Sequence, residues 1–222
     1  MDPVSQGALG AIFAQTISNK KKILIGSILG CIAGLAPDLD IFIRSSSDPL
    51  LKLEYHRQLT HALVFIPIGA LVVAIFTFLF SRKYLSWMET YFYCFFGYAT
   101  HGLLDACTSY GTQLFWPFTD ERISWNNISV VDPLLTVPII IFIIISILKK
   151  NKFITLFGVF YIFLYLGIGV VQENRAEKLG KSIAITRGHE SKRLTVKPSL
   201  GNLFLWKAIY ENNGFYYVDA VR

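Results

Sequence analysis

The sequence predicts an all-α polytopic membrane helical bundle with five or six transmembrane helices, followed by a small α+β C-terminal appendage. Of the 222 residues, 53% are hydrophobic and only 16% are charged, whereas an ordinary soluble domain is about 25% charged. Five apolar runs each approach the roughly 17–25 residues that a helix needs to cross a bilayer. After residue 171 the composition becomes polar. We therefore expect a transmembrane domain carrying the functional site over residues 1–171 and a soluble appendage over residues 172–222.

The apolar runs follow one another with polar connections between them. They are Ile23–Leu39, Ala62–Phe80, Tyr91–Cys107, Leu134–Leu148 and Phe153–Val171. A further segment, Val4–Ile17, is rich in small residues and about 21 Å long at 1.5 Å per residue, which is short for a span. The sequence therefore leaves five and six crossings both open.

Short basic clusters predict the orientation of the bundle. Lys20–Lys22, Arg82–Lys83 and Lys149–Lys152 lie between alternate runs and so fall on one face. Short loops rich in lysine and arginine stay in the cytoplasm. We therefore expect Asp40–Thr60 and Thr108–Pro133 on the outer side. Because topology explains the basic clusters, no nucleic-acid partner is expected.

The appendage begins as a polar continuation of the last apolar run. Two later pieces, Ser182–Thr186 and Phe215–Val221, have the β-branched and aromatic composition of strands. The sequence therefore predicts a helix followed by a small strand region.

The first chemical cluster ends the first long run. Ionisable groups at membrane depth are costly, and each is a functional candidate unless a partner explains it. Pro37 breaks the regular helix there, which lets the carboxylates of Asp38 and Asp40 converge. Hard or borderline divalent cations favour such oxygen ligands. The alternative is that both aspartates only mark the exit of the chain to water.

The second cluster contains two histidines just before the run Ala62–Phe80. Thr60 is expected to cap that helix, which places His61 at its first position and leaves His56 in the approaching loop. The two imidazoles then converge only through a turn. Their spacing is equally compatible with a metal site and with two solvated histidines.

The third cluster is His101 and Asp105, separated by one helical turn on an otherwise apolar helix. Either both residues bind one cation, or Asp105 orients His101. A hydrogen-bonded polar pair between helices is the remaining alternative. The three clusters together predict a divalent metal site at the outer end of the bundle.

Two arginines lie close to these clusters in the sequence. Arg57 lies between the two histidines, and Arg122 lies in the outer segment among hydroxyl and amide side chains. A guanidinium group matches the geometry of a phosphate or carboxylate. Arg57 and Arg122 are therefore the candidates for stabilising negative charge on a substrate.

Four segments of the chain resemble one known family. Met1–Pro3, Pro37–Asp40, His56–His61 and His101–Thr112 together resemble the YdjM/DUF457 family of predicted membrane-bound metal-dependent hydrolases. That family is distantly similar to zinc-dependent phospholipase C and the S1/P1 nucleases, helical enzymes that cleave phosphoesters. The resemblance implies a bacterial inner-membrane protein and a ligand set drawn from Asp38, Asp40, His56, His61, His101 and Asp105.

The sequence departs from that family at Gln6, where many members carry a histidine. An amide is a poorer metal ligand than an imidazole. Either one metal contact is lost in this chain, or Gln6 contacts the substrate or a metal ligand instead.

These observations predict a membrane-bound metal-dependent hydrolase that acts on a phosphoester of a lipid or lipid-linked substrate at the outer face. Zinc is the expected cation, because it can activate water and polarise a phosphoryl oxygen. Asp38 and Asp105 are expected to bind it or to act as base, while Arg57 and Arg122 stabilise developing charge. The alternatives are an ion-coupled transporter, in which buried Asp and His form a relay, and a non-enzymatic membrane scaffold.

Overall fold

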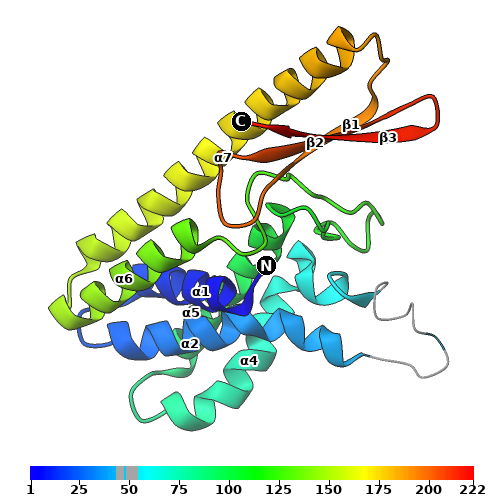
Figure 1. Cartoon of the computed structure of the whole chain (residues 1–222). Helices are drawn as coiled ribbons and strands as arrows, with labels where there is room; N and C mark the ends of the chain where they lie inside the picture. Colours follow the sequence, from blue (N-terminus) through cyan, green and yellow to red (C-terminus); the bar gives the residue numbers. More distant parts are fainter. Residues whose placement is uncertain (44–47, 49–54) are drawn as a thin grey trace.

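The computed structural model describes residues 1–43, 48 and 55–222, so part of the predicted outer segment Asp40–Thr60 lies outside the described residues. Within the described part, six α-helices precede a three-stranded antiparallel sheet (Figure 1). The α-helices are α1 (Pro3–Ile17), α2 (Ile23–Leu35), α4 (Ile66–Ser81), α5 (Trp87–Ala106), α6 (Pro133–Lys149) and α7 (Lys152–Thr186). The other elements are the 3-10 helices η1 (Ala36–Phe42), η2 (Leu59–His61) and η3 (Leu63–Phe65), and the strands β1 (Lys192–Pro198), β2 (Trp206–Asn212) and β3 (Phe215–Val221).

Among the described residues, three helical segments are long and apolar enough to cross a membrane. They are Ile23–Phe42, Leu63–Ser81 and Lys152–Thr186, and α6 is a shorter apolar helix. Together with the C-terminal sheet, they confirm the predicted class of a helical membrane protein with a small α+β appendage. The number of five or six crossings stays a prediction.

Helices α1, α2 and α5 meet at Gly30. A Cβ atom on Gly30 would lie 2.3 Å from the carbonyl oxygen of Gly10, and one on Gly97 would lie 2.4 Å from that of Gly30. The junction therefore excludes side chains, and the backbones approach closely, as small residues allow in membrane bundles. Gln6 and His101 each lie one helical turn from the glycine of their own helix. The junction thus brings two polar residues of the candidate site together.

The predicted cap of the second apolar run is wrong. Thr60 lies in the short 3-10 helix η2, and α4 begins only at Ile66, with Pro67 in its first turn. Proline favours the first turn of a helix because its missing N–H is not needed there. The hydroxyl group of Thr60 donates instead to Asp40 Oδ2, at 2.8 Å.

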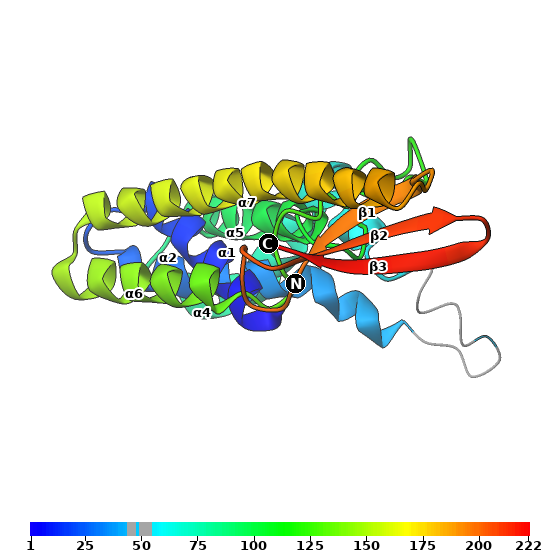
Figure 2. The same ribbon diagram turned by 45° about the horizontal axis from the view of Figure 1, so that its top comes forward.

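Helix α7 runs without interruption from the membrane bundle into the appendage (Figure 1). The sheet, in the order β1-β2-β3, packs against the C-terminal half of this helix, and Figure 2 shows it running alongside that end. The buried residues Ala176, Gly180 and Ala184 recur at intervals of four on one face of α7. A Cβ on Gly180 would lie only 2.9 Å from the Cβ of Ala208 in β2.

This packing explains one wrong prediction in the appendage. The segment Ser182–Thr186 forms the last residues of α7 and is no strand, because the small-residue face of the helix outweighs the local β propensity. The predicted strand Phe215–Val221 is confirmed as β3. The predicted domain boundary after Val171 falls within α7 and stays a prediction.

Candidate metal centre

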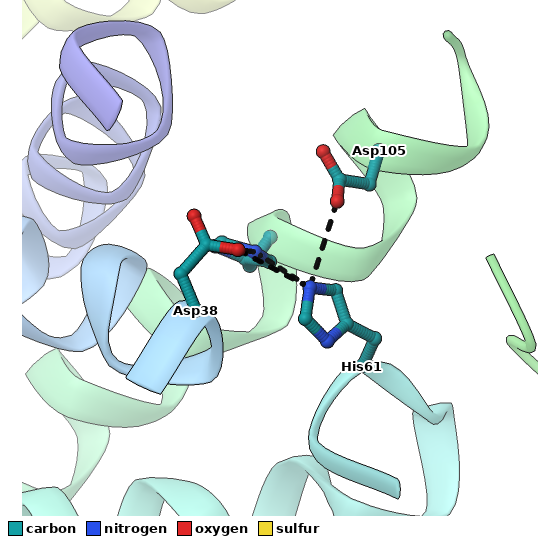
Figure 3. Close-up of side chains that lie close together, drawn as sticks. Asp38, His61 and Asp105 are labelled. Carbon is teal, nitrogen blue, oxygen red and sulfur yellow. Dashed lines mark hydrogen bonds and ion pairs between the residues drawn. The ribbon is translucent and has the colours of Figure 1, made fainter. Parts of the chain in front are cut away.

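The structure brings the six predicted metal ligands together at the end of α2 that lies opposite Lys20–Lys22. Asp38, His61 and Asp105 point toward one another from η1, η2 and α5 (Figure 3). The ligands fall into two groups that share one aspartate, Asp38, His61, His101 and Asp105 in the first and Asp38, Asp40 and His56 in the second. Within each group the ligand atoms all lie within 4.8 Å of one another.

A backbone carbonyl fixes the imidazole of His101. The residue is fully buried, and its Nδ1 lies 2.6 Å from the carbonyl oxygen of Gly34. Because a carbonyl oxygen only accepts, Nδ1 carries a proton and donates it. The Nε2 atom of the neutral imidazole then presents a lone pair. It faces Asp38 Oδ1 at 3.3 Å and His61 Nε2 at 3.0 Å.

The hydroxyl group of Thr60 fixes the imidazole of His61. It donates to Asp40 Oδ2 and lies 3.0 Å from His61 Nδ1. Since its one proton is used on Asp40, the hydroxyl oxygen accepts from the Nδ1–H of His61. The phenol of Tyr98 donates to the Thr60 carbonyl at 2.9 Å and holds this turn in place. The Nε2 atom of neutral His61 is therefore also free to bind a cation.

Four ligand atoms converge in the first group. His61 Nε2, His101 Nε2, Asp38 Oδ1 and Asp105 Oδ2 lie between 3.0 and 3.6 Å apart in the four pairs that are in contact. A tetrahedral ion with bonds of about 2.0–2.1 Å requires ligand atoms about 3.3 Å apart. A cation between them would attract both imidazole lone pairs and both carboxylates. The donor set and its spacing therefore fit a divalent cation.

The electrostatics of the site favour positive charge. Burial disfavours the charged form of His61, but its hydrogen bonds to Asp105, Asp38 and Asp40 outweigh burial and raise the pKa of His61 to about 10. A metal ion that binds Nε2 must therefore displace a proton at neutral pH.

Three groups hold Asp105 in place. Its Oδ1 accepts from Gln6 Nε2 at 2.9 Å and from the Met1 amino group, and its Oδ2 lies 3.0 Å from Arg57 Nε. Gln6 thus contacts a candidate ligand through its amide nitrogen. Its Oε1 is buried and has no hydrogen-bond partner in the described part of the chain.

Arg57 is held tightly but keeps one donor unused. Its backbone has φ 65°, in the left-handed region, where its N–H donates to Asp40 Oδ2 at 3.1 Å. Its guanidinium lies over the ring of Tyr110, 5.1 Å from the centroid. Among the described residues, its buried Nη1 has no hydrogen-bond partner. A free, buried guanidinium N–H beside a metal site is suited to an anionic group.

The cluster is open to its surroundings on the side of Asp38 and His56. Their side chains are 29% and 28% exposed, whereas those of His61, His101 and Asp105 are fully buried. Arg122 lies exposed at this rim, and its Nη1 donates to the carbonyl of His56 at 3.4 Å. Arg57 is thus inside the site and Arg122 at its entrance.

Sequence alone does not indicate the groups that orient the two imidazoles. These are the carbonyl of Gly34, the hydroxyl of Thr60 and the phenol of Tyr98. A backbone carbonyl has no residue-type signal. The only signal for Thr60 is its position beside a histidine, which a helix cap explains equally well.

A family model described as YdjM inner membrane protein matches residues 1–176 of the chain. The match includes all six candidate ligands and the apolar part of α7. The comparison with curated proteins and the comparison with solved structures each give no match.

Proposed function

The chain belongs to the YdjM family of inner membrane proteins, and from that premise we propose that it is a membrane-bound metal-dependent hydrolase. The proposed reaction is hydrolysis of a phosphoester in a lipid or lipid-linked substrate. The observation that carries the proposal is the convergence of four ligand atoms. The two imidazoles among these ligands are each oriented by a hydrogen bond at Nδ1. Such a group of charges at membrane depth is costly, which supports a functional role.

The proposed ligands of the cation are His61, His101 and Asp105, with Asp38 beside them and zinc as our first candidate. A bound divalent cation supplies a Lewis acid that polarises a phosphoryl oxygen and favours deprotonation of water. Four protein ligands close a tetrahedral site, whereas catalytic sites keep one position open. Asp38 is the exposed member of the four. We therefore assign Asp38 to the open side, where its carboxylate acts as the general base.

Arg57 has the second role in this proposal. Its Nε is fixed by Asp105, so its free Nη1 is held in one place beside the ligands. A donor fixed in this way stabilises the negative charge that develops on a phosphoryl oxygen. Arg122, at the entrance, is assigned to the substrate head group.

The second ligand group extends the proposal. His56 Nδ1 and Asp40 Oδ1 lie 2.7 Å apart, and both come close to Asp38. Two ions per chain would mean that Asp38 is shared between them. With one ion per chain, Asp40 would instead orient Thr60 and His61, and His56 would line the entrance.

We further propose that the site faces the outer side of the bacterial inner membrane. The α1–α2 and α6–α7 connections, which carry Lys20–Lys22 and Lys149–Lys152, lie at the same end of the bundle (Figure 1). Asp38 lies beyond the other end of α2. Because basic loops stay in the cytoplasm, a cysteine placed at Ser109 or Thr119 should react with an impermeant reagent in intact cells. Labelling only after the membrane is broken would place the site inside.

The test of the function combines metal content with turnover. Protein purified in detergent without chelators is analysed for metals and assayed on a panel of phosphoesters and acyl esters, lipids included. Wild type, His101→Ala and Asp105→Asn are compared at matched expression. Equal turnover by all three would assign the activity to a contaminant. No turnover by metal-loaded wild type, with no gradient present, would favour the ion-coupled carrier.

A further inference from the structure

An apolar groove runs along the membrane face of the bundle between α1, α2 and α6. Its volume is about 610 Å³, within the range of pockets that hold small-molecule ligands. Small residues of α1, including Gly7, Ala8 and Ala11, form its floor. Leucine and isoleucine side chains of α2 and α6 form its walls, from Leu24 to Leu35 on α2 and from Ile140 to Ile147 on α6.

The groove leads to the candidate metal centre. Leu35 is its last lining residue on α2, and the chain continues directly into the 3-10 helix η1. Three residues make one turn of a 3-10 helix, so Asp38 follows Leu35 after one turn, where its carboxylate contacts His61 and His101. On α1, the lining residue Gly7 is the neighbour of Gln6, which contacts Asp105. The most exposed ligand therefore lies one turn beyond the end of the groove.

The dimensions and surroundings of the groove indicate its occupant. Leu24 and Leu35 lie about 16 Å apart along α2 at 1.5 Å per residue, close to half of a hydrocarbon core about 30 Å thick. The groove belongs to the membrane-spanning segment Ile23–Phe42, and its walls at Leu24, Ile28 and Ile32 are 44–56% exposed. Its surroundings are thus lipid chains, while its end is a cation site with a free guanidinium N–H.

We propose that this groove holds one hydrocarbon chain of the substrate, with the phosphoester at Asp38 and Arg57; this rests on the proposed phosphoester hydrolysis. The substrate is then an amphiphile that enters from the bilayer. A chain moving from lipid into the groove exchanges one apolar environment for another, so little hydrophobic free energy is gained. The groove therefore acts by orienting the phosphoester, and a small misplacement of a reacting group is costly to the rate.

A second apolar groove provides the matched control. It has a volume of about 420 Å³ and lies between α1, α5 and α7, where Phe96, Ala99 and Leu103 line it. On α5 these residues lie on the side of the helix away from His101 and Asp105. A side chain that fills this groove leaves the path to Asp38 unchanged.

The first experiment measures turnover of two phosphodiesters by metal-loaded protein in lipid nanodiscs. Hexadecyl 4-nitrophenyl phosphate and methyl 4-nitrophenyl phosphate present the same bond to water and release the same 4-nitrophenolate. We expect Ala11→Phe to lower kcat/KM for the hexadecyl ester about 10- to 100-fold and to leave the methyl ester unchanged. Ala99→Phe should leave the ratio between the two esters unchanged. Equal effects of both variants on both esters would overturn the proposal that the groove holds the hydrocarbon chain, without contradicting the proposed hydrolase activity.

The second experiment needs no turnover and uses the wild-type protein. Hexadecyl phosphate carrying a diazirine at the end of its chain is photolysed in the nanodiscs, and the adducts are mapped by mass spectrometry. Adducts enriched near Leu24 and Ile147, relative to hexadecanol with the same diazirine, support the groove. The same adduct pattern for both probes overturns it. Absence of turnover on both diesters would count against the hydrolase, and the cross-linking result would still decide the groove.

Discussion

Two buried polar clusters lie in the same helical bundle. They differ in charge and in how fully their hydrogen-bonding groups are used. The hydroxyl cluster, formed by Gln15, Ser27, Ser146 and Thr155, joins α1, α2, α6 and α7 near Lys20–Lys22. Thr155 donates to Gln15 Oε1 at 3.0 Å, Gln15 Nε2 donates to Ser27 at 2.9 Å, and Ser146 lies 2.7 Å from Thr155. Each of its side chains is neutral and has a partner. Nothing in this cluster requires a ligand.

The metal-ligand cluster, formed by Asp38, Asp40, His56, His61, His101 and Asp105, is charged, and its lone pairs converge. Around it, the buried Gln6 Oε1 and Arg57 Nη1 have no partner within the described residues. Buried polarity in a membrane bundle is therefore no mark of function by itself. The distinguishing feature is hydrogen-bonding and coordinating capacity that the protein leaves unused.

The largest expected effect comes from the centre of the metal-ligand cluster. His101→Ala removes one of two oriented imidazoles, so the metal content of purified protein should fall well below that of wild type. Activity should fall by orders of magnitude, because the cation supplies several kcal/mol of transition-state stabilisation. Folding should be affected less, since the change also removes a buried polar group. A variant with wild-type metal content would contradict the ligand assignment.

The next effect concerns charge stabilisation without metal loss. Arg57→Lys keeps a positive charge near Asp105 but removes the planar fork that provides the free Nη1. We expect kcat to fall about 10²–10³-fold, with metal content unchanged. Parallel loss of metal and activity would show that Arg57 serves only to hold Asp105.

A smaller effect is expected from the group behind His61. Thr60→Val removes the hydroxyl that accepts from Nδ1, and loss of such an orienting partner typically weakens metal affinity about 10- to 100-fold. Competition with a chelator of known affinity measures the change. Unchanged affinity would mean that Asp40 alone orients the imidazole.

The pH dependence of metal binding gives a graded effect. The pKa of His61 is raised to about 10, so its protonated form dominates at any lower pH, and each bound ion displaces one proton. Apparent affinity should therefore fall about tenfold per unit as the pH is lowered from 8 to 6. Chelator competition at several pH values tests the slope. A flat profile would mean that Nε2 does not bind the ion.

The smallest effect is expected from a substitution in the hydroxyl cluster. Thr155→Val is the same substitution as Thr60→Val, but it should leave metal affinity and turnover unchanged. It should lower the free energy of unfolding in mixed detergent micelles by about 0.6 kcal/mol, the average for a hydrogen bond between membrane helices. A fall in metal affinity comparable with that of Thr60→Val would erase the distinction between the two clusters.

The sequence was most informative where one element fixes the geometry. His101 and Asp105 lie one turn apart on a single helix, so their common face follows from spacing alone. Asp38 and Asp40 follow Pro37 at the end of an apolar run, which marks their depth. The apolar runs themselves predict the bundle, because bilayer thickness sets the length of a spanning helix.

Features that depend on contacts between distant segments could not be predicted. The sequence leaves His56 and His61 undecided, because contacts between distant segments bring them to the cluster, such as those of Asp40 with Thr60 and His56. The same holds for the junction at Gly30, where three backbones touch. A glycine in an apolar helix has the same local appearance whether it faces lipid or another helix.

The length of α7 has a consequence for how the sheet is held. The helix has 35 residues and is therefore about 52 Å long, and the loop before β2 is anchored separately, since Gly201 N–H donates to Ser129 at 3.3 Å. The position of the sheet around the bundle therefore depends on the number of helical turns in α7. An inserted residue between the bundle and the appendage would turn the sheet by about 100° around the axis of α7 and raise it by about 1.5 Å. Seven inserted residues would restore the phase within about 20° but would lift the sheet away from Ser129.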